Sequence, residues 1–172
     1  MGCRTSVTVS KRLTYHCGSP EATRVLARAL ARHLRAGDVV ALVGPLGAGK
    51  TCFASGLAEA LGVEGRVASP SFVVARFHDG PTPLVHADAY RLSGAEDLLD
   101  AGLDDWLRVA VVAVEWADLA EEALPADRLT VALATDGGGR RIELTATGPR
   151  SLRALEALEH DSSGHRDLEP TS

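Results

Sequence analysis

The stretch DVVALVGPLGAGKT, residues 38–51, decides the fold. Its first part, residues 38–43, is a short and mostly apolar run of the length of a buried strand, and a glycine-rich loop follows at residues 44–49. After the loop, residues 51–61 have the pattern of a helix that ends at Gly62. The sequence therefore predicts a buried strand, a tight loop and a helix in direct succession.

The loop and the two residues after it satisfy the pattern G-x-x-x-x-G-K-[ST] at residues 44–51. Glycines let consecutive backbone N–H groups turn toward one phosphate, and the start of a helix adds partial positive charge. Lys50 would reach the β- and γ-phosphates of a nucleotide, and the Thr51 hydroxyl is a typical Mg²⁺ ligand. The predicted nucleotide contacts are Gly44, Pro45, Leu46, Gly47, Ala48, Gly49, Lys50, Thr51 and Cys52.

The composition is that of an ordinary globular domain, with 172 residues of which 45% are hydrophobic and 24% charged. No apolar run approaches the length of a membrane span, and the first residues lack the apolar core of a secretion signal. The net charge of −5 disfavours a protein that wraps nucleic acid by itself, and the three cysteines suit a reduced cytosol. We expect one domain over residues 1–160, a disordered tail at 161–172 and a cytoplasmic location.

Helices and strands alternate along the rest of the chain. Ser19 and Pro20 mark a helix start, and residues 109–114 form the best second candidate for a buried strand. The pattern predicts an α/β protein with the P-loop NTPase fold, in which a mostly parallel central sheet has helices on both faces and an antiparallel hairpin at one edge. Further strands are expected at 6–13, 73–78, 84–90, 128–135 and 140–147, the last two forming the hairpin, and further helices at 95–107, 118–124 and 151–160.

A carboxylate follows the second buried strand. Glu115 is the first acid after residues 109–114, and the carboxyl ends of parallel strands form the usual ligand crevice of such sheets. There Glu115 would hold Mg²⁺ through a water or polarise the attacking water, unless it is a strand-end carboxylate that faces solvent. Trp116 either stacks on a base, faces a partner or packs at the rim of the core.

Three polar residues form the remaining cluster. On a strand, His86, Asp88 and Tyr90 lie on one face, which suggests a site close to the glycine-rich loop. The alternative is a half-exposed hairpin with its polar side toward water.

These motifs together resemble those of the TsaE (YjeE) family. The loop at 44–51, Ser69-Pro70-Ser71-Phe72, His86-x-Asp88-x-Tyr90-Arg91 and Val114-Glu115-Trp116 have that family's order and spacing, and the match covers residues 19–147. The resemblance implies a bacterial cytosolic ATPase that uses ATP/ADP and Mg²⁺ and is required for threonylcarbamoyladenosine in tRNA. It would act with the transferase subunits TsaD and TsaB, contact tRNA only through that complex and bind no membrane.

The resemblance also assigns roles to single residues. Lys50 and Thr51 would bind phosphate and Mg²⁺, Glu115 would be the Walker B-like acid and metal ligand, and Asp88 would lie near the metal or the attacking water. The other implied positions are Trp116 and Arg140 at the nucleotide and Ser69 and Ser71 in a loop likened to a switch. Intrinsic hydrolysis would be weak, because the chain has no Gln and no obvious arginine finger.

Three other functions compete with this interpretation. A small-molecule kinase usually closes an Arg-rich lid over the phosphates, whereas residues 96–105 are acidic and Arg140-Arg141 is the only basic pair near a loop. A GTPase normally reads guanine with an Asn-Lys-x-Asp loop, and the chain has no Asn. A nucleotide-gated adaptor without turnover fits the sequence equally well.

The first helix carries a row of arginines. Arg24, Arg28 and Arg32 follow one another at helical spacing and share one face. Such a row is either a solvated surface or a local basic patch for tRNA or an acidic partner.

Overall fold

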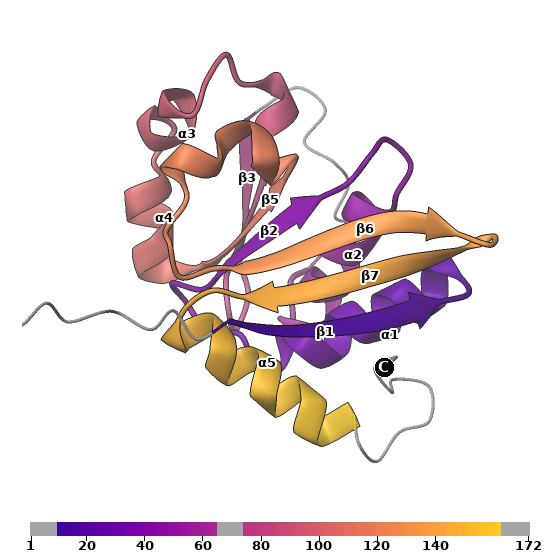
Figure 1. Ribbon diagram of the computed structural model, residues 1–172. Helices are drawn as coiled ribbons and strands as arrows, with labels where there is room; N and C mark the ends of the chain where they lie inside the picture. Colours follow the sequence, from indigo (N-terminus) through magenta and orange to yellow (C-terminus); the bar gives the residue numbers. More distant parts are fainter. Residues whose placement is uncertain (1–9, 65–73, 163–172) are drawn as a thin grey trace, which may run out of the picture.

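The computed structural model describes residues 10–64 and 74–162, which fold around one sheet of seven strands in the order β1-β7-β6-β2-β5-β4-β3 (Figure 1). Helices pack on both of its faces. The strands are β1 (Lys11–Cys17), β2 (Val39–Val43), β3 (Ala75–His78), β4 (Leu84–Asp88), β5 (Val111–Glu115), β6 (Leu129–Asp136) and β7 (Gly139–Ala146). The helices are α1 (Pro20–Ala31), α2 (Lys50–Ala60), α3 (Glu96–Asp100), α4 (Leu103–Val109) and α5 (Pro149–Ser162), with 3₁₀ turns η1 (Ala89–Arg91) and η2 (Ala117–Ala123).

The middle of the sheet follows the prediction. β2 lies at the centre and pairs in parallel with β5 and with β6. Side chains alternate across the sheet, so Val40 and Leu42 pack in the core under α1, α2 and α5, while Val39 and Ala41 pack under α3, α4 and η2. The predicted α/β architecture with helices on both faces is therefore confirmed.

The flanks of the sheet differ from the prediction. Three strand pairs are parallel and three antiparallel in the described part of the chain, so the sheet is mixed and not mostly parallel. The β6–β7 hairpin forms as expected, but β1 pairs with β7 along its whole length and takes the edge position. The reason is the alternation of Leu13, Tyr15 and Cys17, which buries one face of β1 in the core. Of the strand expected at 6–13, residues 6–9 lie outside the described part, and the observed strand continues to Cys17.

Three helix or strand boundaries differ from the sequence-based prediction. β4 ends at Asp88, because its carboxylate accepts the Tyr90 backbone N–H at 3.1 Å and starts the turn η1. β5 begins at Val111, because Val109 is 53% exposed and ends α4. α5 continues through Ser162, so the first two residues of the expected tail are helical, and the others lie outside the described residues.

The arginine row on α1 is largely paired. Arg24 and Arg28 both contact Glu21, and Arg28 also contacts Glu59 of α2. These contacts neutralise much of the charge that a basic patch would need, so the structure favours a solvated surface here. In the ranges 10–64 and 74–162, no helix is long and apolar enough to cross a bilayer.

Candidate functional site

The glycine-rich loop lies between β2 and α2, in the predicted succession. Gly44 has φ +148, and a Cβ there would lie 2.3 Å from the Leu133 carbonyl oxygen of β6, so this position requires glycine. The helix begins at Lys50, one residue earlier than expected. The loop is therefore held against the sheet at its first residue and ends in the first turn of a helix.

Lys50 folds back onto this loop. Its side chain is buried, and Nζ donates to the carbonyl oxygens of Gly44 at 2.5 Å and Pro45 at 2.9 Å. Nζ also lies 3.7 Å from the centre of the Trp116 ring, a cation–π contact. Burial lowers the pKa of the Lys50 ammonium, while the nearby carboxylates of Glu115 and others act in the opposite direction. A bound anion would replace carbonyl partners with a stronger one.

Thr51 and Glu115, far apart in the sequence, meet at the base of the site. The Thr51 hydroxyl donates to the two carboxylate oxygens of Glu115 at 2.8 and 3.0 Å. Glu115 ends β5 and is 3% exposed, which contradicts the alternative that it faces solvent. The two residues that the sequence analysis assigned to one metal site are therefore in direct contact.

The polar residues of β4 lie beside Glu115. Asp88 is opposite Glu115 in the parallel β4–β5 register and is 6% exposed. His86 is fully buried, and its Nε2 is 2.8 Å from Glu115 Oε1. The predicted shared face holds for these two residues, but Tyr90 is on η1 and not on the strand. The alternative of a half-exposed polar hairpin face is wrong for β4, which is buried along its length.

Two aromatic rings cover one side of the site. Trp116 and Tyr90 have ring centroids 5.1 Å apart, at an interplanar angle of 44°. Among the residues that the structure describes, Trp116 alone has a positive φ without being glycine, at +55°. That conformation turns the chain after β5 and brings the ring over Lys50, so Trp116 faces the site as well as the rim of the core.

Arg140 braces the loop from the other side. Its Nε donates to the Ala48 carbonyl and its Nη2 to the Gly47 carbonyl, both at 3.0 Å. Arg140 comes from β7, close to the glycine turn at 137–138, so the β6–β7 hairpin is tied to the loop. These contacts position the loop backbone.

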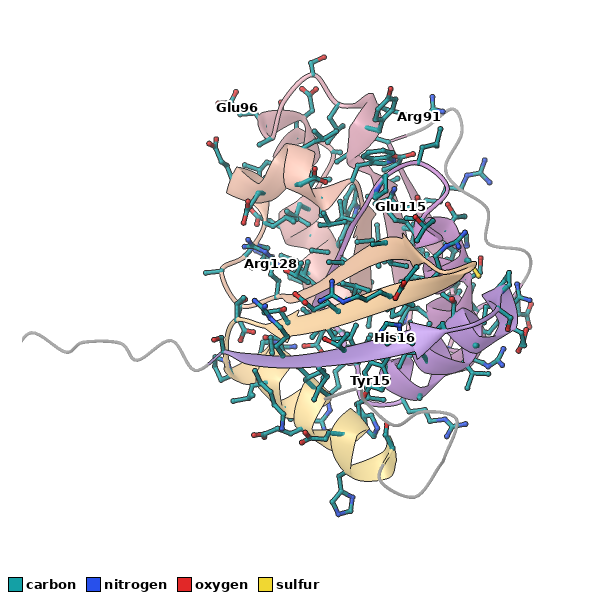
Figure 2. The ribbon with its side chains drawn as sticks, turned by 45° about the vertical axis from the view of Figure 1, so that its right-hand side comes forward. Tyr15, His16, Arg91, Glu96, Glu115 and Arg128 are labelled. Carbon is teal, nitrogen blue, oxygen red and sulfur yellow. The ribbon has the colours of Figure 1, made fainter. Side chains whose placement is uncertain are left out.

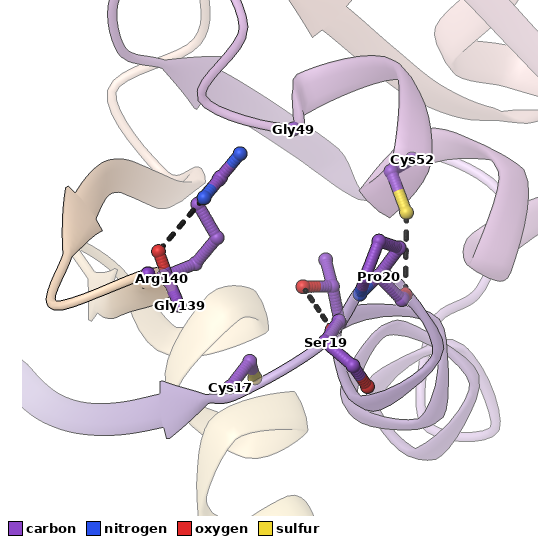
Figure 3. A pocket seen from close by; sticks show the side chains of 9 residues that line it. Cys17, Ser19, Pro20, Gly49, Cys52, Gly139 and Arg140 are labelled. Carbon is purple, nitrogen blue, oxygen red and sulfur yellow. Dashed lines mark hydrogen bonds between the residues drawn. The ribbon is translucent and has the colours of Figure 1, made fainter.

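Two hollows adjoin the loop. The larger, about 540 Å³, lies over the Thr51–Glu115 pair, and Figure 2 marks the position of Glu115. Its lining is Leu46, Gly47, Gly49, Lys50, Thr51, Cys52, Asp88, Tyr90, Glu115 and Trp116. The smaller, about 320 Å³, lies between the end of β1, the start of α1 and Arg140 (Figure 3). Its lining is Cys17, Ser19, Pro20, Thr23, Gly49, Cys52, Gly138, Gly139 and Arg140.

Most predicted site residues therefore come together. Gly44 and Pro45 contribute carbonyls to Lys50, and the Ala48 side chain is buried in the core. Ser69 and Ser71 lie outside the described residues. The sequence analysis did not assign Cys17 or Thr23 to a site, and no local motif marks them, because the smaller hollow is built from three distant segments.

Thr51 and Glu115 offer oxygen atoms of the kind that Mg²⁺ binds. In the described ranges, no three His, Cys, Asp or Glu side chains converge on one point where a metal could bind. Mg²⁺ usually binds through one or two protein oxygens together with substrate phosphates and waters. The Thr51 hydroxyl and the Glu115 carboxylate, in contact beside the loop, fit that requirement.

Comparisons with known proteins agree with this geometry. Residues 17–142 match the family model of the threonylcarbamoyl adenosine biosynthesis protein TsaE. The tRNA threonylcarbamoyladenosine biosynthesis protein TsaE of Streptomyces coelicolor is 48% identical over 137 residues, covering 74% of this chain and 92% of that protein. The protein of the same name from Bacillus subtilis is 40% identical over 156 residues, covering 88% and 98%.

A solved structure shows the same likeness in three dimensions. The crystal structure of YdiB from Bacillus subtilis superposes with a TM-score of 0.76 at 38% sequence identity, over 89% of this chain and 97% of that one. The family model spans residues 17–142, which include β2, the glycine-rich loop and Glu115. The chain therefore belongs to the TsaE family of threonylcarbamoyl adenosine biosynthesis proteins.

Proposed function

We propose that this protein is a Mg²⁺-dependent ATPase that supports threonylcarbamoyladenosine modification of tRNA, acting in the cytosol with homologues of TsaD and TsaB. Membership of the TsaE family supports the pathway. The single observation that carries the ATPase proposal is the Thr51–Glu115 contact beside the glycine-rich loop. It joins a metal-ligand hydroxyl to a carboxylate at the place where nucleotide phosphates would lie.

The finer description of the fold is part of this proposal. In a P-loop NTPase, a buried parallel strand leads through the glycine-rich loop into a helix whose first residues are Lys and Ser or Thr. β2, the loop and α2 have that arrangement, and the parallel neighbour β5 brings Glu115 to the same end of the sheet. We therefore assign the P-loop NTPase fold to the chain.

The two hollows divide the nucleotide between them. Gly49 and Cys52 line both, so the two hollows are neighbours at the start of α2. The phosphates would lie in the larger hollow, within reach of Lys50 and Thr51, and the nucleoside in the smaller one. The smaller hollow is lined by side chains of α1 and by the glycine turn before β7, which leave a base and a sugar room to enter.

The chain's own groups have distinct tasks in this site. Lys50 would exchange its carbonyl partners Gly44 and Pro45 for phosphate oxygens, which are charged and bind an ammonium more strongly. Thr51 and Glu115 would hold Mg²⁺, which when bound neutralises the developing phosphate charge. Asp88, buried beside Glu115, can accept a proton from or orient a water at the end of the phosphate chain.

Slow intrinsic hydrolysis fits the same residues. The chain contains no Gln to orient the attacking water. Arg140 is the one arginine among the described residues that line the two hollows. It donates hydrogen bonds to the loop carbonyls, so it stabilises the loop and does not contact a leaving phosphate. A partner that completes the site would raise turnover, as expected for an accessory protein of a larger complex.

The test is an assay with the organism's own TsaD–TsaB pair. Association is measured by pull-down with ATP, with ADP and without nucleotide, and phosphate release is measured in the same mixtures. The proposal predicts nucleotide-dependent association and faster phosphate release in the complex than from the protein alone. Association without any phosphate release would favour a nucleotide-gated adaptor, and phosphate transfer to a metabolite in place of water would favour a kinase.

A further inference from the structure

His86 is a buried histidine that the proposed function does not yet use. It lies in the middle of β4 with none of its surface exposed. Its neighbours along the strand are the core residues Val85 and Ala87, which point to the other face of the sheet. Leucine at this position would bury a similar volume without a polar atom. Burying an imidazole costs free energy unless the ring makes a hydrogen bond, so a polar contact of His86 is expected.

The contacts of His86 define that task. Its Nε2 lies 2.8 Å from Glu115 Oε1, and the same oxygen accepts the Thr51 hydroxyl at 2.8 Å. An ionised carboxylate can only accept hydrogen bonds, so with Glu115 ionised the proton of this contact lies on Nε2. The other ring nitrogen, Nδ1, is buried and has no hydrogen-bond partner among the described residues. Among the described residues, the hydrogen bond of Nε2 to Glu115 is therefore the polar contact of this ring.

The surroundings of Glu115 need such a donor. Asp88 lies directly across the β4–β5 register and carries a second negative charge, which repels the Glu115 carboxylate. The Lys50 ammonium attracts the Glu115 carboxylate, but it donates its hydrogen bonds to the loop carbonyls of Gly44 and Pro45. His86 is fully buried on β4 and is not among the residues that line the hollow, so it contacts the Glu115 carboxylate from within the protein interior.

We propose that His86 is the positioning residue of the metal site: its Nε2–H holds the Glu115 carboxylate so that the carboxylate accepts the hydrogen bond of the Thr51 hydroxyl and leaves a lone pair of the Thr51 oxygen free to bind Mg²⁺. The inference rests on the proposed function, since it names what orients the proposed metal ligands. It adds His86 to a site in which the sequence analysis had given that residue no separate role. Groups that orient metal ligands typically change metal affinity or activity by about 10–100-fold when they are removed.

Two substitutions of similar size separate this role from simple packing. His86→Gln keeps a nitrogen donor at comparable reach, and His86→Leu fills the space without one. We expect ATP binding without Mg²⁺ to stay within about threefold of wild type in both variants. In His86→Leu, the Mg²⁺ concentration that half-saturates ADP binding should rise about 10-fold or more and kcat should fall by a similar factor, with KM for ATP nearly unchanged. His86→Gln should recover most of both losses.

Two results would overturn the proposal. One is a His86→Leu protein with the Mg²⁺ requirement of wild type; the other is an equal loss in both variants, which would reduce the ring to packing. If the proposed function itself is wrong, wild-type protein will bind ADP without any Mg²⁺ dependence, so the two failures are distinguishable.

A measurement on the unaltered protein keeps the inference testable if the variants do not fold. Proton–nitrogen correlation spectra of isotope-labelled wild-type protein report which ring nitrogen of His86 is protonated. The proposal predicts a proton on Nε2, the nitrogen that faces Glu115. A bare Nε2 would contradict it, because Glu115 would then have no donor from this side.

Discussion

The most direct structural prediction concerns Gly44→Ala, with Gly47→Ala as its matched control. Both glycines belong to the same loop and both have positive φ, +148 and +77. A Cβ at Gly44 would lie 2.3 Å from the backbone oxygen of Leu133, whereas a Cβ at Gly47 would have nothing within 4 Å. The comparison therefore separates the close approach of the loop to β6 from the conformational preference that both positions share.

The magnitude follows from these contacts. At Gly47, left-handed backbone costs alanine about 1–2 kcal/mol, and the loss of unfolded-chain entropy returns about 0.4–1 kcal/mol. At Gly44 the backbone strain of about 1–3 kcal/mol is joined by a steric cost of about 1–3 kcal/mol, because a backbone carbonyl cannot rotate away as a side chain can. We expect Gly44→Ala to be less stable than Gly47→Ala by roughly 2–4 kcal/mol.

Urea unfolding at equilibrium measures this difference. With a typical slope of about 1–3 kcal/mol per molar urea, the Gly44→Ala midpoint should lie about 1 M or more below that of Gly47→Ala. Coinciding midpoints would refute the close packing of the loop on β6.

The other predictions address the chemistry of the site and the arginine row. Thr51→Ala should weaken ATP binding more in the presence of Mg²⁺ than in its absence, and an equal effect in calorimetry would remove Thr51 from the metal site. Glu115→Ala and Asp88→Ala should bind ATP in the absence of Mg²⁺ nearly as well as wild type but lose about 100-fold in turnover with Mg²⁺ and the partners present, and unchanged phosphate release would reduce both to structural roles. Replacing Arg24 and Arg28 by Gln should leave association with TsaD–TsaB unchanged at low salt, because Glu21 and Glu59 already pair with these two arginines. A loss of association would support the basic-patch hypothesis.

Local sequence patterns were enough to predict the elements at the centre of the sheet. The succession of β2, loop and α2 follows from residues that are adjacent in the sequence, and Glu115 was found because it ends an apolar strand. The site residues around it gather because parallel strands present their carboxyl ends at one side of the sheet. The proximity of Thr51 and Glu115 therefore follows from the sequence without knowledge of any contact distance.

The features that the sequence did not predict depend on contacts between residues far apart in the chain. Nothing in Leu13, Tyr15 or Cys17 says that their strand pairs with β7, which is more than a hundred residues away in the chain. Tyr90 lies outside the strand because its backbone N–H donates to the Asp88 side chain, which starts a turn. The alternation of residues along a strand does not reveal such a side-chain contact. The smaller hollow joins three distant segments, and the role of His86 depends on a contact between two strands.

Calorimetric titration of ATP into the wild-type protein and into Lys50→Ala tests the central claim most directly. Lys11→Ala is the control, because Lys11 is the only other lysine of the chain and pairs with Glu159 on α5, away from the site. The account predicts Mg²⁺-dependent ATP binding to wild type and to Lys11→Ala, and none to Lys50→Ala with its fold intact by circular dichroism. Equal binding of ATP by Lys50→Ala and wild type would contradict the assignment of this loop as the nucleotide site.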